Sequence, residues 1–375
     1  MNELKEVKIT NFLDVDYVYL PYDKNMNLHV KDKEYIYKNQ LILDSETKKI
    51  NSSVSGNILG LTTINNKKYI VVENDFKEKQ EKKVGCKRYI NNYTKEEFCD
   101  LINDYRVLND FDINSKVLVV SGIDEYIGEV TYTTLLKNYT IEILDSIDAI
   151  IEIMNIKKAF LAVNNSDVDC VNILYNNMGT YPKIDLKLFN NDYSIGNKHI
   201  LINKLTNYKN KNYGVLYLNI KDVLNLYNLL KRRRPLSETY ITLTGDLIDY
   251  TEVLRVKIGT NLSDIINKYN IDKKDNIIVN GLLNGIKINS TNFVIDNNVR
   301  SIFINTIKEY KETKCINCGM CINSCPQGIN PKYMHFNKDK KANDYRSKCV
   351  NCGICSYLCP SKINLRENEV YNDKE

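Results

Sequence analysis

Eight of the eleven cysteines lie near the C-terminal end of the sequence, in two groups with the same spacing. The first group consists of Cys315, Cys318, Cys321 and Cys325-Pro326, and the second of Cys349, Cys352, Cys355 and Cys359-Pro360. Each reads C-x2-C-x2-C-x3-C-P, a spacing typical of thiolate ligands to [4Fe–4S] clusters. In this pattern three thiolates bind one cluster, and the fourth, next to the proline, binds the other cluster.

The sequence therefore predicts two [4Fe–4S] clusters whose ligands are exchanged between the groups. The first cluster site consists of Cys315, Cys318, Cys321 and Cys359, and the second cluster site consists of Cys349, Cys352, Cys355 and Cys325. Gly319 and Gly353 follow the second cysteine of each group, where a side chain would crowd a cluster and its N–H···S hydrogen bonds.

Zinc and disulfides are the alternative uses of closely spaced cysteines. Zinc binds pairs of the C-x2-C type, but two pairs suffice for one ion, and neither the third cysteine nor the trailing Cys-Pro is then needed. Disulfides between such near neighbours would be strained, and the sequence lacks a secretory signal that would take it to an oxidising compartment. Both alternatives explain less of the pattern than iron–sulfur clusters do.

Composition limits the class of protein. The chain has 375 residues and a formal net charge of +5, which is mild for this length and does not indicate nucleic-acid binding. Its apolar runs, such as 116–120 and 149–154, are too short to span a bilayer. We therefore expect a cytoplasmic protein without a membrane span, in a reducing compartment that keeps thiolates available.

Residues 1–80 are predicted to form a small β module. Short runs rich in β-branched and aromatic residues, such as 18–20, 40–43 and 69–72, are separated by turn residues. The arrangement resembles a barrel-sandwich (lipoyl-like) module. Residues 54–56, Val-Ser-Gly, stand where such a module often carries a modified lysine, so we expect a structural role.

Residues 81–233 alternate between strand and helix patterns. Thr94 and Glu97 resemble a capping box that opens a helix ending near Tyr105. The predicted strands are 116–120, 158–163, 183–189 and 214–218, and the predicted helices are 135–154, 168–178, 197–205 and 221–230. This βαβ alternation favours a mostly parallel sheet and a Rossmann-like domain.

A nucleotide site would normally lie at the end of the first strand of such a sheet. Here the loop 121–128 has no G-x-G-x-x-G pattern, and Asp124 and Glu125 stand where a pyrophosphate needs bare N–H groups. The two carboxylates would repel a phosphate, although they could still hydrogen-bond a ribose. The sequence argues against phosphate binding at this loop.

Residues 234–300 have the pattern of a small α+β domain of β-grasp type, and 301–375 that of a helical two-cluster domain. A helix predicted over 302–311 leads to the first cysteine group. The basic run 231–234 just before the β-grasp part has two interpretations. It is either a solvated helix C-terminus or a docking patch for an acidic partner or a cofactor phosphate.

The order of these parts resembles one family. A barrel-sandwich module, a Rossmann-like domain, a β-grasp (SLBB) domain and a two-cluster ferredoxin-type domain are similar to RnfC, a component of the Rnf electron-transport complex. They are equally similar to soluble relatives such as PrdC, the electron-transfer protein associated with proline reductase. The similarity lies in 214–219, 235–236, 242–245, 256–260, Gly281 with Gly285, and the cysteine groups. It implies an electron-transport protein that works between a donor protein and an acceptor protein.

The resemblance also implies an FMN and NADH site in the Rossmann-like domain, but this sequence departs from that site. The family's glycine-rich loop has no counterpart between Tyr93 and Lys116, and residues 101–110 contain no glycine. The family's acidic segment is reduced to 124–127, and a lysine, Lys198, replaces its later glutamate. Because flavin binding requires close approach of the backbone, we expect no residues for FMN or NAD(H) and a domain kept as scaffold.

Three functions are consistent with the sequence. The first is an electron carrier that passes electrons through two [4Fe–4S] clusters to an acceptor reductase, for which the resemblance implies proline reductase. The second is an NAD(P)H-dependent flavin and iron–sulfur oxidoreductase, and the third a peripheral RnfC-type component of a membrane electron-transport complex. No catalytic residue is predicted, since His29, His199 and His335 lie outside recognisable nucleophile or zinc patterns.

Overall fold

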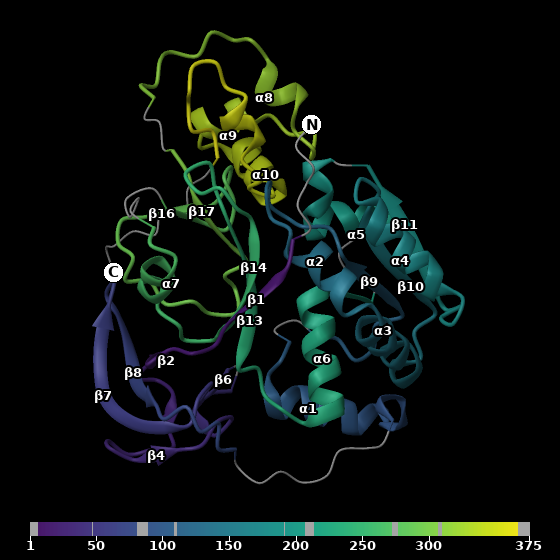
Figure 1. The fold of residues 1–375 in the computed structure, drawn as a ribbon. Helices are drawn as coiled ribbons and strands as arrows, with labels where there is room; N and C mark the ends of the chain where they lie inside the picture. The colour runs from purple at the N-terminus through teal and green to yellow at the C-terminus, as the bar shows by residue number, and fades with distance from the viewer. Residues whose placement is uncertain are drawn as a thin grey trace.

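The computed structural model describes residues 7–46, 48–80, 89–108, 111–190, 192–206, 214–271, 277–306 and 310–366. The N-terminal strands form two antiparallel sheets (Figure 1). The first has the order β2 (Tyr17–Tyr22), β8 (Lys67–Asn74), β7 (Gly56–Ile64) and β4 (Tyr35–Ile36). The second contains β3 (Asn27–Leu28), β5 (Leu41–Asp44) and β6 (Lys49–Asn51).

A parallel sheet follows, as the alternating pattern predicted. Its order is β11 (Ile184–Phe189), β10 (Lys158–Asn164), β9 (Val117–Ser121) and β12 (Val215–Asn219). Every residue of β9 is buried, because helices cover both faces of the sheet. The larger core contains residues of α2 (Thr131–Asn138), α3 (Thr140–Met154), α4 (Val168–Met178) and α6 (Ile220–Arg232), and the smaller core residues of α5 (Lys198–Thr206).

Two helix predictions near this sheet have clear outcomes. The capping box is confirmed: the Thr94 side chain accepts from the Glu97 backbone N–H, and α1 (Lys95–Tyr105) follows the short η1 (Ile90–Asn92). The single helix predicted over 135–154 is instead two helices, α2 and α3, which meet at Tyr139. Tyr139 has φ −128° and ψ 35°, outside the helical region, so the backbone turns there although the apolar spacing continues.

A six-stranded mixed sheet lies between the N-terminal sheets and the parallel sheet (Figure 1). Its order is β1 (Ile9–Phe12), β14 (Glu252–Lys257), β13 (Glu238–Thr244), β17 (Ser301–Ile304), β15 (Ile277–Val279) and β16 (Ile286–Ile288). Helix α7 (Leu262–Lys268) contributes Leu262, Ile265 and Ile266 to the core of this sheet. The N-terminal strand β1 therefore belongs to a sheet whose other strands come from residues 238–304, because β1 pairs parallel with β14.

The helix predicted over 302–311 is wrong for its first residues. Ser301–Ile304 form β17, a strand with all four residues buried between β13 and β15. Residues 307–309 of the predicted helix lie outside the described residues. A buried strand accounts for the apolar residues at this position, since a short apolar run fits a strand and a helix equally well.

The C-terminal part is built from four short helices and projects from the rest of the molecule (Figure 1). They are α8 (Met320–Asn323), α9 (Pro331–Phe336), α10 (Lys340–Lys348) and α11 (Ile354–Tyr357). Across the described ranges, none of the helices has the length and apolar character needed to cross a membrane.

Candidate iron–sulfur centre

The two cysteine groups adopt the same local conformation. The asparagine and the glycine on either side of the second cysteine have positive φ: 59° at Asn317, 76° at Gly319, 50° at Asn351 and 80° at Gly353. Asparagine and glycine tolerate this left-handed region best. The repeated sequence Asn-Cys-Gly therefore gives each group the same turn, and a one-turn helix, α8 or α11, follows it.

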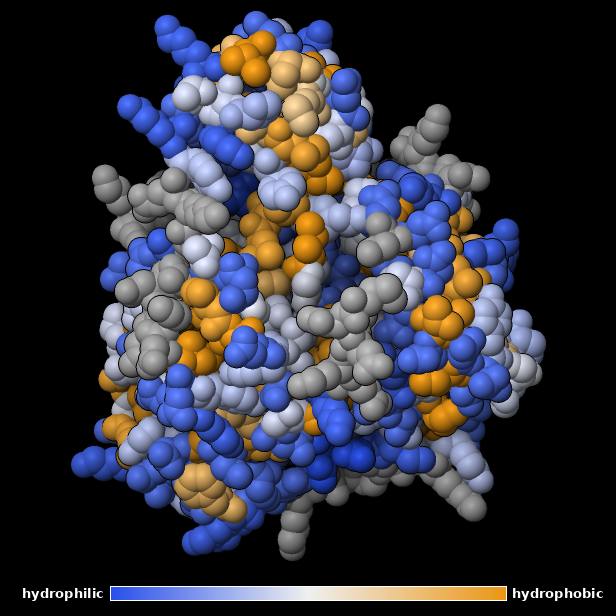
Figure 2. All heavy atoms as spheres, turned by 45° about the horizontal axis from the view of Figure 1, so that its top comes forward, coloured by the Kyte–Doolittle hydropathy of each residue, from blue (hydrophilic) through white to orange (hydrophobic). Residues whose placement is uncertain are grey.

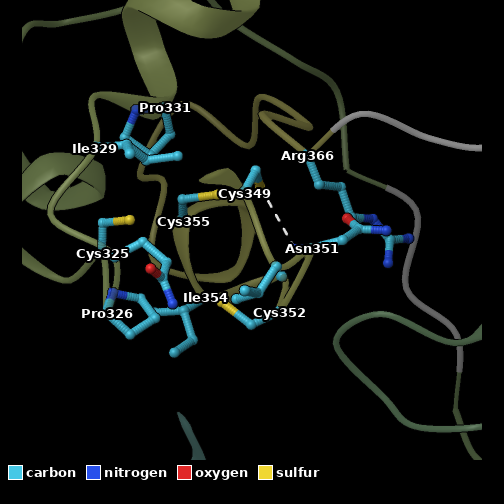
Figure 3. Close-up of a pocket in the computed structure, with 13 residues that line it drawn as sticks. Cys325, Pro326, Ile329, Pro331, Cys349, Asn351, Cys352, Ile354, Cys355 and Arg366 are labelled. Atoms are coloured by element: carbon cyan, nitrogen blue, oxygen red, sulfur yellow. Dashed lines mark hydrogen bonds between the residues drawn. The ribbon is translucent and has the colours of Figure 1, made fainter. Parts of the chain in front are cut away.

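Cys325 lies with the three leading cysteines of the other group. It lines one pocket together with Cys349, Cys352 and Cys355. Figure 3 shows these four side chains around a common space, whose wall also includes Ile354 and other apolar residues. Four free thiols around an apolar pocket are a donor set that fits a [4Fe–4S] cluster.

Cys359 lies in the corresponding place in a second pocket. That pocket is lined by Cys315, Cys318, Cys321 and Cys359, all free thiols. Ile363 and other apolar residues complete the lining, so this donor set has the same chemistry as the other pocket. The two pockets thus contain the two sets of four cysteines that the spacing groups together, while the binding of iron by each set stays a prediction.

Hydrogen bonds join the two ends of the C-terminal part beside the first cluster site. The Thr313 backbone N–H donates to the Ser361 carbonyl at 3.0 Å, and the Ser361 hydroxyl donates to the Lys314 carbonyl at 3.0 Å. These contacts place the chain before Cys315 next to the chain after Cys359. Two cysteines that are far apart in sequence, Cys315 and Cys359, are brought to the same pocket in this way.

Burial affects the acidity of several of these thiols. It raises the pKa of Cys355 to about 11, and the neighbouring Cys352 raises it further. The pKa values of Cys352 and Cys321 are also raised, chiefly by burial. Only a thiolate binds iron, so cluster insertion must release these protons, which makes the thiols' affinity for a cluster rise with pH.

The second cluster site packs against the body of the molecule. A Cβ on Gly353 would lie 2.3 Å from the carbonyl oxygen of Leu283, in the turn between β15 and β16. The Arg366 guanidinium donates to the same carbonyl at 2.8 Å. The Tyr193 hydroxyl, from η2 (Tyr193–Gly196), donates to the Cys352 carbonyl at 3.0 Å. Contacts from two different parts of the fold therefore fix this site, and none of them was predictable from the cysteine motif.

The acidic side chains of the loop after β9 form hydrogen bonds and an ion pair within the protein. The Asp124 carboxylate accepts from the backbone N–H groups of Tyr132 at 2.7 Å and Thr133 at 3.3 Å, and from the Thr133 hydroxyl at 2.8 Å. These N–H groups are at the N-terminus of α2, where a bound phosphate would otherwise be favourable. Glu125 forms an ion pair with Arg300. The protein's own carboxylate thus occupies the anion position at this helix.

A partly buried group of charges beside this loop was missed by sequence reasoning. The Arg300 guanidinium forms an ion pair with Glu125 and cation–π contacts with the rings of Tyr126 and Tyr132. Glu129 is 5% exposed, and its Oε1 has no hydrogen-bond partner among the described residues. Burial, followed by the nearby Asp124, raises the pKa of Glu129 to about 8. The contacts of Arg300 join residues that are more than a hundred positions apart in the sequence, so no local sequence pattern predicts them.

A large cavity lies among the N-terminal strands, the parallel sheet and the six-stranded sheet. Its volume is about 640 Å³. Cationic side chains from all three parts line it: Lys49, Lys67, Arg106, Lys198, Lys221 and Arg300. Burial lowers the pKa of Lys221 to about 8, and its ammonium donates to the carbonyls of Asn297 at 3.1 Å and Val299 at 3.3 Å.

Residues 105–108, from the stretch of the sequence without glycine, line this same cavity. Tyr105, Arg106, Val107 and Leu108 contribute to its wall. These four residues contribute side chains and no glycine to the wall, whereas flavin binding requires close approach of bare backbone. The volume suits a nucleotide cofactor, whereas this part of the lining does not match the flavin-binding pattern.

The remaining predicted features lie apart from the cysteine pockets. His29 hydrogen-bonds Asp44 at 3.0 Å between β3 and β5. The basic run 231–234 spans the C-terminus of α6, where Arg233 is the left-handed C-cap. Lysine and arginine at a helix C-terminus interact favourably with its dipole, which is the simpler of the two interpretations of this run.

Comparison with known proteins also indicates iron–sulfur clusters in the C-terminal part. The family model described as "4Fe-4S dicluster domain" matches residues 314–363. Together with the two four-cysteine pockets, this match defines an iron–sulfur protein of the electron-transport class.

Among curated proteins, the C component of the ion-translocating oxidoreductase complex of Buchnera aphidicola is 26% identical over 58% of this chain and 46% of its own length. The same component from Actinobacillus succinogenes is 25% identical over 62% of this chain and 35% of its own length. Its counterpart in the proton-translocating ferredoxin:NAD(+) oxidoreductase complex of Clostridium ljungdahlii is 24% identical over 54% of this chain and 46% of its length. The chain is similar to these components over part of its length, and it spans less than half of the length of each of them.

A solved structure of an NAD+-reducing [NiFe]-hydrogenase covers 58% of the chain and 47% of its own length, with a TM-score of 0.43 and 10% identity.

Proposed function

We propose that this chain is an electron-transfer protein in which electrons pass through two [4Fe–4S] clusters to an acceptor reductase. The observation that carries the proposal is the pair of pockets, each lined by four free cysteines drawn from both motifs. We assign Cys315, Cys318, Cys321 and Cys359 to one cluster and Cys349, Cys352, Cys355 and Cys325 to the other.

The chain's own residues have three tasks in this function. The apolar walls of the two pockets limit the access of water to the sulfur atoms, which influences the reduction potential. Backbone N–H groups donate to sulfur, as Asn351 does to Cys349 Sγ at 3.4 Å. The exchange of Cys325 and Cys359 between the motifs keeps the two sites close together, which favours rapid transfer between them.

The acceptor we propose is proline reductase, with the chain acting in the cytoplasm as a PrdC-like carrier. This choice rests on the family resemblance and on the match to RnfC proteins, whose names describe oxidoreductase complexes. We further propose the division into residues 1–80 as a barrel-sandwich module, 81–233 as a Rossmann-like domain, 234–300 as a β-grasp (SLBB) domain and 301–375 as the two-cluster domain.

The test is anaerobic purification followed by quantitation of iron, sulfide and flavin. We expect about eight irons per chain, the number that two [4Fe–4S] clusters require, and a broad visible absorbance. The protein reduced with dithionite should then reoxidise when purified proline reductase and proline are added. Far fewer irons, or zinc in their place, would refute the proposal. Full iron content without reoxidation would refute only the choice of acceptor.

A second candidate function is an NAD(P)H-dependent flavin and iron–sulfur oxidoreductase. The cavity of about 640 Å³ favours it, because nucleotide cofactors occupy pockets of roughly 300–1,000 Å³ and because its cationic lining suits phosphate groups. Near-stoichiometric flavin released on heating, together with bleaching by NADH, would replace the first function with this one. A Lys67→Glu variant should then weaken flavin retention, since Lys67 contributes positive charge to the lining of the cavity.

A further inference from the structure

The two cluster sites differ in what surrounds them. At the second cluster site, Gly353 is buried against Leu283 and the Cys352 carbonyl accepts from Tyr193, so the body of the protein covers this side. At the first cluster site, Cys318 is exposed, the one motif cysteine of the eight that is. Electron transfer becomes slow over long distances, so a partner protein must approach the site that faces solvent.

Large apolar side chains surround the exposed cysteine. Ile316 is 65% exposed, Met320 41% and Ile322 39%. Exposed apolar groups of this size are unusual unless they meet a partner, and here three of them come from one stretch of seven residues. Figure 2 shows apolar residues gathered on the projecting C-terminal part, with hydrophilic residues around them.

The C-terminal part is also strongly basic. Residues 310–366 contain ten lysines and arginines against three aspartates and glutamates, a formal charge of +7, whereas the whole chain carries +5. Lys314 and Lys362 are both exposed, and the hydrogen bonds between Thr313, Ser361 and Lys314 bring their segments together next to the first cluster site. An apolar centre with a basic rim is the pattern of a transient interface with an acidic protein.

We infer that an acidic electron-transfer protein docks at the first cluster site. The docking face consists of Ile316, Met320 and Ile322 at its centre and Lys314 and Lys362 at its rim. This inference rests on the proposed electron-transfer function and adds which site exchanges electrons with the partner. The second cluster site then exchanges electrons with this partner only through the first cluster site.

A protein partner accounts for the docking face better than two other occupants. An anionic membrane would also attract lysines, but it offers no redox centre to the exposed Cys318. A second copy of this chain would present the same basic charge, and two faces of like charge repel each other. An acidic partner satisfies both the charge and the need for a nearby redox centre.

The test measures binding and electron transfer separately, on the chain loaded with clusters. The probe is an oxidised, fluorescently labelled acidic bacterial ferredoxin, and its Kd is measured by anisotropy at about 20 mM and about 150 mM salt. We expect the Lys314→Glu/Lys362→Glu variant to weaken binding about tenfold or more at low salt, because electrostatic steering contributes factors of roughly 10 to 10³. Ile316→Gln/Met320→Gln should weaken binding at both salt concentrations.

The matched control is Lys157→Glu/Lys158→Glu, which makes the same charge change at two exposed lysines at the start of β10. It should leave the Kd within about twofold of the parent, and the rate of reduction by dithionite should be the same in all variants. Equal weakening by the control variant, or no weakening by either docking-face variant, overturns the docking face.

The same samples separate this inference from the proposed function. Unchanged binding by variants that retain about eight irons overturns the docking face and leaves the electron-transfer function standing. Absence of the clusters overturns both. Vesicles of phosphatidylglycerol that bind the chain more tightly than the ferredoxin does, or a dimer that Ile316→Gln/Met320→Gln dissociates, would replace the acidic protein with a membrane or a second copy.

Discussion

Each of the two pockets contains three cysteines of one motif and one cysteine of the other. The spacing was sufficient to group the eight thiols, because the C-x2-C-x2-C-x3-C-P pattern has a strong local geometry that two positive-φ residues per turn enforce. What the spacing could not predict are the residues from other segments, such as Tyr193 and Leu283, whose contacts with the second cluster site arise only from the tertiary fold.

The proposed exchange of ligands between the motifs predicts an unusual pattern of iron loss. Cys325→Ser and Cys352→Ser both remove ligands of the second cluster site, so the double variant should retain about four irons per chain, as each single variant does. Cys318→Ser combined with Cys325→Ser removes one ligand from each site and should lose most of the iron. The measurement is iron and sulfide content after anaerobic purification. If Cys318→Ser/Cys325→Ser instead retains about four irons, each motif binds its own cluster.

At the level of elements, the turns that carry Gly319 and Gly353 look alike but have different neighbours. Both glycines have positive φ, at 76° and 80°. A Cβ on Gly353 would overlap the Leu283 carbonyl, whereas the nearest atom to a Cβ on Gly319 is 3.9 Å away. The motif alone explains both glycines in the same way, because each leaves room for a cluster. The structure adds a second explanation for Gly353 only, its close contact with Leu283.

This difference predicts unequal effects of alanine. Gly319→Ala should cost about 1 kcal/mol, the strain of a non-glycine residue in the left-handed region. Gly353→Ala should cost roughly 2–3 kcal/mol, since it must also displace the turn between β15 and β16. Thermal unfolding of the cluster-loaded proteins measures both. Equal costs would show that the Leu283 contact is easily displaced.

The buried acid in the segment between β9 and α2 predicts a dependence of stability on pH. Burial raises the pKa of Glu129 to about 8 in the folded protein, well above the value of about 4.3 expected when unfolded. Between these two pKa values the folded state keeps a proton on Glu129 that the unfolded state has lost. The stability of the folded state therefore falls as pH rises from about 4.5 through about 8. Asp124, whose pKa burial raises to about 6, acts in the same direction.

Glu129→Gln should remove much of this dependence. The amide stays neutral at all pH values, and its oxygen can still accept from the Tyr126 N–H, which donates to Glu129 Oε2 at 3.2 Å. Between pH 5.5 and pH 8 we expect the variant to lose roughly 1–3 kcal/mol less unfolding free energy than the parent, measured by urea denaturation. Glu96→Gln, at an exposed position on α1, serves as control and should follow the parent. A parallel pH profile in Glu129→Gln would contradict the assignment.

Secondary structure was predictable where periodicity and a capping signal agreed, and less so where only an apolar run was available. The strands of the parallel sheet and the start of α1 were predicted because burial on both faces and the Thr94–Glu97 capping box leave local signals. The strand β17 was not, because four apolar or small residues fit a helix equally well.

Across the whole molecule, a partly buried charge network connects the N-terminal strands to the six-stranded sheet. Glu78 forms ion pairs with Lys38 and with Lys257, and the distance to Lys257 Nζ is 2.5 Å. The side chain of Lys38 is 8% exposed and that of Lys257 is 3% exposed. Glu238 pairs with Lys38 at 3.2 Å and with Arg255 at 2.5 Å. The network joins residues up to two hundred positions apart, so it fixes two segments that the sequence treats as separate modules.

Removal of the shared carboxylate should therefore weaken the joint between these segments. Glu78→Ala leaves two buried ammonium groups facing each other, and we expect a loss of about 2 kcal/mol. This is less than the value for a fully enclosed pair, because the Glu78 side chain is 44% exposed. Glu73→Ala, an exposed glutamate on β8, is the control and should change stability by less than about 0.5 kcal/mol. Chemical denaturation at low salt compares the two, and equal losses would assign the effect to general surface charge.

The pairing of β1 with β14 constrains how the protein is made. Ile9 lies opposite Val253, so the partner of the first described strand emerges from the ribosome 244 residues later. At about 5–20 residues per second, that interval lasts roughly 12–50 seconds. During synthesis the β1 segment must stay unpaired for this time, and its sheet can be completed only shortly before the cysteine groups themselves are translated.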